Sequence, residues 1–452
     1  MLKRDITVTF AGNLVATILS LGDAVILARV LGPTNRGALG LALFIPSITA
    51  TFCILGQETV NTTFAGLYKD KRAGLFEQSL IITLFGTVVS TLVICAFYFW
   101  LPIERGQFNQ LTPDIIWLSC LITPIALLGQ MTIALVRGVG QIAAAAFIHV
   151  MQVAALLALL VIFLLWRDGG LRTALLLWAL APLVTVVLSI WVLRDYVTLR
   201  PSNFSAWLFK KSLIFGGQIG LATFSTFLVY RIDQGILAYM VPTHQLGLYI
   251  TAVALAERLR LLPNSIATAF LPRLANELPS RQLQVPMVFR GTAVVSAGSM
   301  FLVGILGVPA VLVLFGWDYS GAIPSFLLLL PGIASLGGSS ILASDLIARG
   351  KPKYGIWTGY ATLAINIAFN LALIPLIGIA GAAVSSSVSY IAATVLWLFF
   401  YWRESKTSLY KMIPTLEDVK YVFAGVVSVI RQIIVLSNAK LKSIDFIGAR
   451  KR

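Results

Sequence analysis

The stretch LLLWALAPLVTVVLSIW, from Leu175 to Trp191, contains no charged side chain. Such a segment is typical of a membrane-spanning helix, because roughly 20 apolar residues in helical form cross the hydrocarbon core of a bilayer. Similar runs recur along the chain, in which 58% of residues are hydrophobic and 12% are charged. Soluble domains carry about 25% charged residues. The composition therefore predicts that lipid surrounds most of this protein.

Charged residues and clusters of proline and glycine divide the chain into twelve apolar stretches. We expect spans near residues 6–30, 37–62, 78–101, 114–136, 141–165, 171–193, 213–240, 245–270, 292–316, 322–347, 354–376 and 379–402. The alternating pattern of a membrane β-barrel does not occur, so we predict an all-α polytopic membrane protein. The first stretch follows Lys3 and Arg4 as in a signal peptide, but its length and the charged residues near its end indicate a retained span.

A short motif occurs twice in the chain. Residues 23–28, DAVILA, return as residues 233–238, DQGILA, and a Pro-Thr pair follows each copy. An Arg-Gly pair also recurs, at Arg137 and at Arg349. Repeats of this kind are typical of transporters built from two related bundles around a central site. We therefore predict pseudo-symmetric six-helix bundles at 1–205 and 206–402, followed by a basic cytoplasmic tail at 403–452.

Positive charge is distributed unevenly between the two sides of the predicted bundles. With a cytoplasmic N-terminus, sixteen Lys and Arg residues up to the twelfth span lie on the inner side. The outer side holds only Arg29, Arg36, Arg105, Arg167 and Arg172. The positive-inside rule thus places both termini in the cytoplasm. The net charge of +16 is mainly a topology signal, and we expect no nucleic-acid partner.

The tail contains a modest apolar run from Tyr421 to Leu436. The run is short for a span and contains Arg431, and as a thirteenth span it would carry the basic C-terminal residues outward. We predict instead an amphipathic helix on the inner membrane surface, attracted to anionic lipid by the flanking cations.

Several cationic residues fall in or near the predicted spans, where an ionised group costs at least a few kcal/mol. The candidates for a substrate-binding cavity are Arg231, Arg258, Arg260 and Arg29. Guanidinium groups in such a cavity would accept phosphate or acidic sugars. Glu257 and Arg260 lie three apart and are expected to pair, which leaves Arg258 free for an anionic ligand. If this helix ends at Pro263 instead, the arginines lie at the membrane interface.

Four acidic residues are candidates either for coupling to an ion gradient or for structural pairing. They are Asp23, Asp233, Glu257 and Glu58. The two aspartates occupy equivalent positions of the repeat, where burial would make the charge of a carboxyl group switchable. Alternatively, they pair with Arg29 or Arg231, or are solvated near the rim. Solvation at the interface is a sufficient explanation for Glu58 and for Asp345.

The sequence contains no indication of a catalytic, metal or cofactor site. His149 and His244 are scattered, and Cys53, Cys95 and Cys120 show no paired spacing and are expected to be packing residues. A phosphate-binding glycine loop, a nucleophile elbow and a paired-carboxylate motif are also missing from the sequence. Transport would therefore use a proton or sodium gradient, the membrane potential, or consumption of the substrate on the far side.

Three segments carry a resemblance to a known family. The first is RGKP at 349–352, followed by Asn366, Asn370 and IPLIGIAGAA at 374–383. The others are GLY at 247–249 with Ala252, and ARVLGP at 28–33 with Gly37. Together they resemble the polysaccharide (O-antigen and exopolysaccharide) flippase branch of the multidrug/oligosaccharidyl-lipid/polysaccharide exporter superfamily. The resemblance extends over nearly the whole chain to Trp402, as a pattern of helices and turns with few polar signatures.

The resemblance implies two six-helix lobes that alternate between inward-open and outward-open states. They would move a polyprenyl-pyrophosphate-linked oligosaccharide from the inner to the outer leaflet of a bacterial cytoplasmic membrane for polysaccharide biosynthesis. The lipid-linked saccharide and membrane lipid are the expected partners, and an assembly with a polysaccharide polymerase or ligase leaves no mark in the sequence. The family has no catalytic signature that can be transferred to this sequence. The choice of cavity residues is therefore based on their charge and on their depth in the predicted spans.

Three alternative functions differ in what they require. An ion-coupled multidrug or metabolite exporter of the same superfamily would hold an anionic cavity for organic cations, which Arg231, Arg258 and Arg260 oppose. A peptidoglycan lipid flippase usually resembles a chain of fourteen spans. A membrane-embedded polysaccharide-assembly enzyme would need a catalytic histidine or paired acids in a loop, and the sequence shows no such loop.

Overall fold

The computed structural model describes residues 2–54, 56–100, 112–165, 169–196, 204–261, 263, 281–351 and 353–424. Within these ranges every regular element is a helix, which confirms the all-α fold. The principal helices are α1 (Leu2–Cys53), α2 (Gln57–Leu67), α3 (Arg72–Trp100), α4 (Pro113–Gly138), α5 (Ile142–Leu160), α6 (Leu171–Leu193), α7 (Ala206–Met240), α8 (Thr243–Ala256), α10 (Arg281–Ala310), α11 (Ile323–Ala348), α12 (Lys353–Ile377) and α13 (Ile379–Ser405). Ten helices of the described part are long and apolar enough to cross a membrane.

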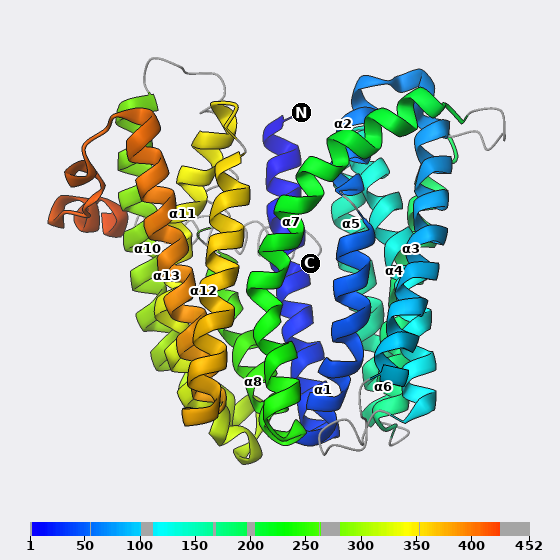
Figure 1. The fold of residues 1–452 in the computed structure, drawn as a ribbon, viewed down its shortest axis with the longest axis horizontal. Coiled ribbons are helices and arrows are strands. Elements are labelled where there is room, and N and C mark those ends of the chain that lie inside the picture. Colours follow the sequence, from blue (N-terminus) through cyan, green and yellow to red (C-terminus); the bar gives the residue numbers. More distant parts are fainter. Residues whose placement is uncertain are drawn as a thin grey trace, which may run out of the picture.

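Helix α1 consists of two arms joined at Gly32. This residue has φ 70° and ψ 171°, a conformation that favours glycine because it lacks a Cβ atom. Pro33 then begins the second arm, where its missing N–H costs nothing. Figure 1 shows the first arm running from the N-terminus to one end of the molecule and the second arm returning from there. The turn lies between the predicted stretches 6–30 and 37–62.

Two of the expected helices are interrupted inside the protein. The stretch predicted at 37–62 stops at Cys53 and resumes as α2 after Gly56, which has φ 67°. The helix predicted at 245–270 leaves the α-helical geometry at Glu257, and the 3₁₀ turn η4 (Glu257–Arg260) follows α8. Pro263 lies just beyond and cannot donate to the carbonyl group of Leu259.

The helices form two halves that meet along α1, α7 and α8. Helices α3 to α6 pack on one another and on α1, whereas α10 to α13 pack together with α7 against α12. Helix α1 contacts α8 and α7, and α2 contacts α7. Figure 1 shows α10 to α13 on one side, α3 to α6 on the other, and α1, α7 and α8 between them. Helix α7 begins at Ala206, the first residue of the predicted second bundle.

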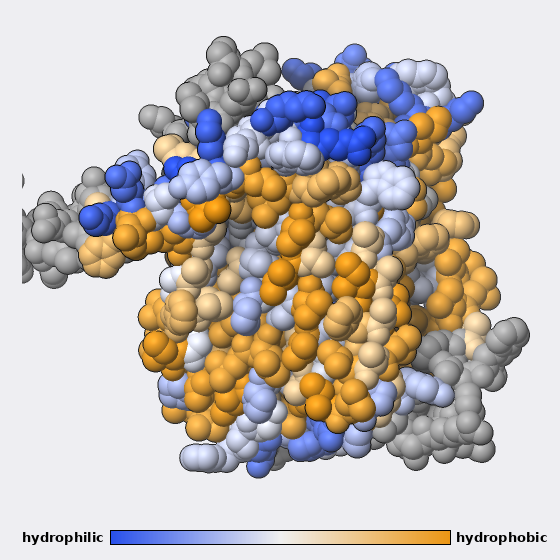
Figure 2. All heavy atoms as spheres, turned by 60° about the vertical axis from the view of Figure 1, so that its left-hand side comes forward, coloured by the Kyte–Doolittle hydropathy of each residue, from blue (hydrophilic) through white to orange (hydrophobic). Residues whose placement is uncertain are grey.

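Large apolar side chains are exposed on the outward faces of many helices. Examples are Leu84, Val187, Ile305 and Val313, each more than three-fifths exposed. Figure 2 shows a broad hydrophobic belt below a hydrophilic band at one end of the molecule. A soluble protein does not expose an apolar surface of this extent. The chain is therefore a multi-pass membrane protein.

The segment after α13 folds back onto the second half. Met412 is buried against α10 to α13, and the Arg290 Nε lies 2.8 Å from a carboxylate oxygen of Asp418. Residues 416–424 form a short helix that Thr415 and Asp418 cap reciprocally. Burial raises the pKa of Asp418, but its hydrogen bonds with Thr415 and Arg290 outweigh this and lower it overall. The amphipathic helix was predicted at residues 421–436. Its part from residue 425 onward lies outside the described residues.

The end of the molecule that holds Gly32 is tightly closed. Gly37 and Gly247 meet where α1 crosses α8, and a Cβ atom on Gly247 would lie 1.8 Å from the Pro33 carbonyl oxygen. The Tyr319 hydroxyl also donates a 2.9 Å hydrogen bond to the Ala28 carbonyl oxygen. We refer to these contacts, with those of Arg29 described below, as the turn-end seal. Only glycine at position 247 permits this approach of the two backbones.

The substitution Gly247→Ala tests the seal. The added methyl group overpacks the crossing, and we expect it to lower the free energy of unfolding by about 1–3 kcal/mol. Gly298→Ala is the matched control, because a Cβ atom there meets nothing within 4 Å and alanine improves a helix by up to about 1 kcal/mol. Thermal unfolding in detergent compares the two variants. Equal melting temperatures would show that the crossing is not tight.

Candidate functional site

Three of the candidate charged residues, Arg231, Glu257 and Arg260, line two separate cavities. The first, here the interlobe cavity, has a volume of about 220 Å³ and lies between the second arm of α1, α7 and α8. Its polar lining consists of Arg36, Ser47, Arg231, Gln234 and Glu257, and apolar groups that include Phe44, Trp178 and Phe227 complete the wall. Both halves of the protein contribute to this cavity.

Positive charge exceeds negative charge in the interlobe cavity. The Arg231 Nη2 lies 3.3 Å from a carboxylate oxygen of Glu257, and both side chains are about one-third exposed. Arg36 lines the same cavity and has no carboxylate partner among the ion pairs of the described residues. One guanidinium group therefore remains uncompensated. The predicted pair between Glu257 and Arg260 is wrong, because Glu257 pairs with Arg231 of α7 and Arg260 lies over the Tyr230 ring.

Arg258 points away from both cavities and toward α1. Its Nη1 donates a 2.8 Å hydrogen bond to the Ser20 hydroxyl, and it interacts electrostatically with Asp23. Asp23 is buried, and its Oδ1 has no hydrogen-bond partner. Arg258 was predicted to be free for an anionic ligand. The structure shows it instead as a contact between the two halves.

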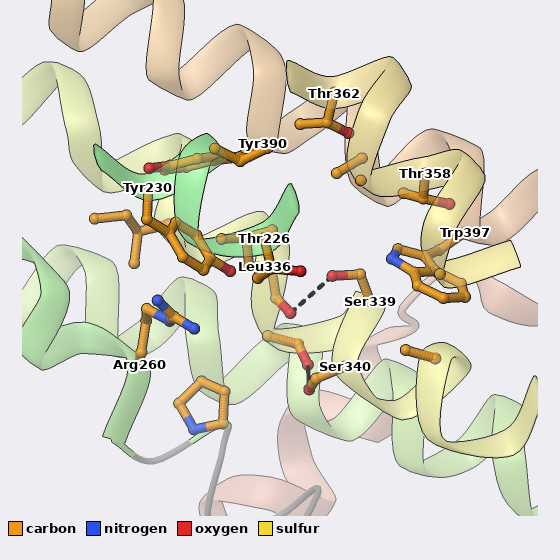
Figure 3. A pocket seen from close by; sticks show the side chains of 18 residues that line it. Thr226, Tyr230, Arg260, Leu336, Ser339, Ser340, Thr358, Thr362, Tyr390 and Trp397 are labelled. Carbon is orange, nitrogen blue, oxygen red and sulfur yellow. Dashed lines mark hydrogen bonds between the residues drawn. The ribbon is translucent and has the colours of Figure 1, made fainter. Parts of the chain in front are cut away.

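Arg260 lies in the second cavity, here called the C-half cavity. This cavity also has a volume of about 220 Å³ and is lined by α7, α11, α12 and α13 (Figure 3). The guanidinium carbon of Arg260 lies 4.3 Å from the centre of the Tyr230 ring. Such stacking holds the cation over an aromatic face and leaves its N–H groups free in the plane.

Arg29 lines neither cavity. Its guanidinium group donates a 2.6 Å hydrogen bond to the Leu314 carbonyl oxygen and another to that of Val313. Both acceptors belong to the π-helical segment η5 (Val311–Phe315), which ends α10. Carbonyl groups at a helix end lack partners within the helix, and a cation there is favourable. Arg29 thus joins α1 to the second half as part of the turn-end seal.

The acidic candidates differ in how completely they are hydrogen bonded. Asp233 is buried and accepts from the Tyr249 hydroxyl, the Ser386 hydroxyl at 3.1 Å and the Gln234 backbone at 2.7 Å. Neither Asp23 nor Asp233 forms an ion pair with Arg29 or Arg231, so that structural alternative is wrong. Asp233 is a satisfied part of the core, whereas Asp23 retains an unused acceptor.

The remaining acids lie closer to one end of the molecule. Glu58 is half-buried in the first turn of α2, where the helix dipole favours a carboxylate. Asp345 is fully buried and pairs with the Arg349 Nε at 2.6 Å, so interface solvation does not explain it. Within the described residues no cluster of His, Cys, Asp and Glu has the composition of a metal site.

The architecture is that of a polytopic α-helical membrane protein. It is similar to an inward-facing multidrug resistance MATE family transporter of the MOP superfamily, with a TM-score of 0.67 and 15% identity over 87% of this chain and 96% of that one. It is also similar to the lipid II flippase MurJ in an inward closed conformation, with a TM-score of 0.65 and 14% identity over 91% of this chain and 89% of that one. At these identities the likeness shows the fold alone.

The profile of the family "Polysaccharide biosynthesis protein" matches residues 2–277, more than half of the chain, so the chain belongs to this family. The capsular polysaccharide biosynthesis protein CapF of Staphylococcus aureus is 23% identical over 257 residues. That match covers 55% of this chain and 65% of CapF, just under two thirds of the relative. The predicted resemblance to polysaccharide flippases of the MOP superfamily is confirmed. The two similar solved structures are named as a MATE family transporter and a lipid II flippase.

A double-mutant cycle on Arg231→Ala and Glu257→Ala tests the central ion pair. Each single variant leaves one charge unpaired, so we expect the double variant to be more stable than the sum of single effects predicts. With one-third of each side chain exposed, the coupling should be on the order of 1 kcal/mol. Thermal unfolding measures it. The same cycle on Arg194 and Asp195, a pair at 3.6 Å with both side chains mostly exposed, should give nearly zero.

Proposed function

We propose that this protein flips a polyprenyl-pyrophosphate-linked oligosaccharide from the inner to the outer leaflet of a bacterial cytoplasmic membrane. The main support for this proposal is the charge of the interlobe cavity, where Arg36 and Arg231 face a single carboxylate, that of Glu257. Both halves line this cavity, so their relative movement would change its access. Membership of a polysaccharide biosynthesis family supports a saccharide as the cargo.

The charge of the cavity favours an anion over an organic cation. A guanidinium group in a partly water-excluded site costs free energy unless an oxyanion or carboxylate compensates it. A pyrophosphate offers several oxygen atoms to a planar guanidinium fork, and such charge-assisted hydrogen bonds are about twice as strong as neutral ones. A multidrug exporter would present negative charge in this cavity. It is therefore only the second candidate, supported by the similarity of the fold.

The turn-end seal supports transport by alternating access. To release cargo at that end, the contacts of Arg29 with Val313 and Leu314 must break, and Gly37 must separate from Gly247. The contacts of Arg29 are polar and those of the glycines are small, whereas buried side chains such as Leu246 and Tyr319 beside them would also have to separate. With the N-terminus in the cytoplasm, as the positive-inside rule favours, the sealed end faces outward. A polymerase or ligase there would consume the flipped saccharide.

Asp23 is the better candidate for coupling to a proton or sodium gradient. A buried carboxylate with one unpartnered oxygen can take up a proton or a cation, because burying an unsatisfied charge is costly. Asp23 has this property, and its neighbour Arg258 connects it to η4. Asp233 accepts from three donors and needs no cation. Protonation of Asp23 would weaken its attraction to Arg258 and loosen the contact between the halves.

Reconstitution in liposomes tests the flippase proposal. A labelled polyprenyl-pyrophosphate oligosaccharide is placed in the membrane, and an external reagent that cannot cross the bilayer reports its exposure. We expect protein-dependent exchange, and expect Arg36→Ala and Arg231→Ala each to slow it about ten- to a hundredfold, because each removes a charged hydrogen bond worth about 1.5–3 kcal/mol. Arg194→Ala is the control, since this exposed residue pairs with Asp195 outside both cavities.

Two outcomes would overturn this proposal. Full activity in both arginine variants would show that the interlobe cavity does not bind the headgroup. Absence of exchange with the unsubstituted protein, together with ion-driven uptake of small organic cations, would identify a multidrug exporter instead.

The substitutions Asp23→Asn and Asp233→Asn test the coupling. We expect Asp23→Asn to abolish the dependence of flipping on an imposed proton or sodium gradient, because the amide cannot titrate. Asp233→Asn should lower the unfolding free energy by about 1–3 kcal/mol and leave the gradient dependence of the folded protein unchanged. Flipping rates with the gradient on, off and reversed provide the measurement. A full gradient response in Asp23→Asn would exclude this residue as the coupling group.

A further inference from the structure

The C-half cavity is separate from the interlobe cavity but shares a wall with it. Tyr230 lines the C-half cavity, and the next residue, Arg231, lines the interlobe cavity. The same division occurs on η4, where Glu257 belongs to the interlobe cavity and Arg260 to the C-half cavity. Ligands in the two cavities would therefore contact neighbouring residues of the same two elements.

Hydroxyl groups dominate the polar lining of the C-half cavity. They come from Thr226, Ser339, Ser340, Thr358 and Thr362. Ser339 and Ser340 donate to the backbone carbonyl groups of Leu336 and Gly337 at 2.9 and 2.7 Å, so their oxygen lone pairs remain available to accept (Figure 3). The cavity thus presents acceptors along α11.

Two further hydroxyl groups of this lining lack any partner. Thr358 and Thr362 are 3% and 2% exposed, and the Oγ1 atom of each makes no hydrogen bond. Leaving a buried hydroxyl unsatisfied costs about 1–3 kcal/mol. Both threonines come from α12, one turn apart on the same face. A ligand rich in hydroxyl groups would satisfy them.

Aromatic side chains face this polar lining from two sides. Figure 3 shows Tyr230 from α7 and Trp397 from α13 on opposite sides of the cavity. Rings with a polar edge offer an apolar face together with an O–H or N–H donor. A pyranose ring has the complementary form, with C–H groups on its faces and hydroxyl groups around its rim.

Arg260 adds a single positive charge to this neutral site. It stacks on Tyr230, and among the ion pairs of the described residues it has no carboxylate partner. A guanidinium group held in this way presents its N–H fork to a carboxylate. The cavity is lined to accept a sugar that also bears an acid group.

We propose that the C-half cavity binds one carboxylate-bearing pyranose ring of the transported saccharide, with its ring between Tyr230 and Trp397 and its carboxylate on Arg260. This rests on the proposed function, in which the pyrophosphate occupies the interlobe cavity. The shared wall places the two sites next to each other, and a movement of α7 or η4 that joins the cavities would let one molecule occupy both, with its charged linkage beside Arg231 and an acidic sugar beside Tyr230. Selection of cargo falls to the C-half cavity.

Protection of an engineered thiol tests this site without any transport assay. The native residues Cys53, Cys95 and Cys120, which are free thiols, are replaced by alanine, and Ser340→Cys introduces a reporter into the C-half cavity. A small maleimide is reacted with the purified protein in the presence of sodium D-glucuronate or D-glucose. Ser47→Cys in the interlobe cavity serves as the matched control.

We expect D-glucuronate to slow labelling at position 340 severalfold, to slow it less at position 47, and to outperform D-glucose at equal concentration. Arg260→Gln should reduce the effect of D-glucuronate to that of D-glucose, and Trp397→Ala should weaken both. No protection at position 340, or equal protection at both positions, would overturn the proposal. If the thiol at 340 does not react, Ser339→Cys reports on the same cavity, and unreactive thiols at both positions would show that it is closed to sugars from water.

The outcome is distinguishable from that of the flipping experiment. Protection by D-glucuronate without lipid-linked exchange would keep the sugar site and reject the flippase. Exchange without protection would keep the flippase and reject this sugar site.

Discussion

The hydrocarbon core of the bilayer contains no water that could hydrogen bond to a free backbone group, and this constraint shapes the whole protein. Every described segment at membrane depth is helical, and helical breaks occur only where other parts of the protein cover them or at an end. The 3₁₀ turn Glu257–Arg260 is such a break, because it packs against α8, α10 and α11 rather than lipid. The irregular geometry and the concentration of charge therefore occur at the same place.

This coincidence lets a short segment serve two cavities. Successive side chains of a regular helix are 100° apart, and adjacent residues of α7 already point to different cavities. On η4, Glu257 lines the interlobe cavity, Arg258 contacts α1 and Arg260 lines the C-half cavity. A movement of α7 or η4 would consequently alter all three environments together. These neighbouring residues of α7 and η4 are therefore sufficient to couple binding in a cavity to the contact between the two halves.

Much of the fold follows from the sequence, whereas the site follows only in part. Span length and apolar character are local properties, so the helices were predictable, and the turn at Gly32 falls between the predicted stretches 6–30 and 37–62. The pairing of Glu257 was not predictable, because its partner Arg231 lies 26 residues away on α7. Arg36 lies between the predicted spans 6–30 and 37–62 and was therefore placed on the outer side, whereas in the structure it lies in the first turn of the second arm of α1 and lines the interlobe cavity. The partners of Arg29 lie 284 and 285 residues away, and no local pattern indicates them.

The Arg29 contact has a consequence for how the protein can evolve. Its acceptors are main-chain oxygen atoms of Val313 and Leu314, so the identities of those side chains are irrelevant to the bond. Val313 is 68% exposed and can therefore vary to suit the surrounding lipid. The contact therefore requires an arginine at position 29 but no particular side chain at positions 313 and 314. Related chains should accordingly retain this arginine while positions 313 and 314 drift without compensating changes, so the Arg29 contact leaves no covarying pair of residues.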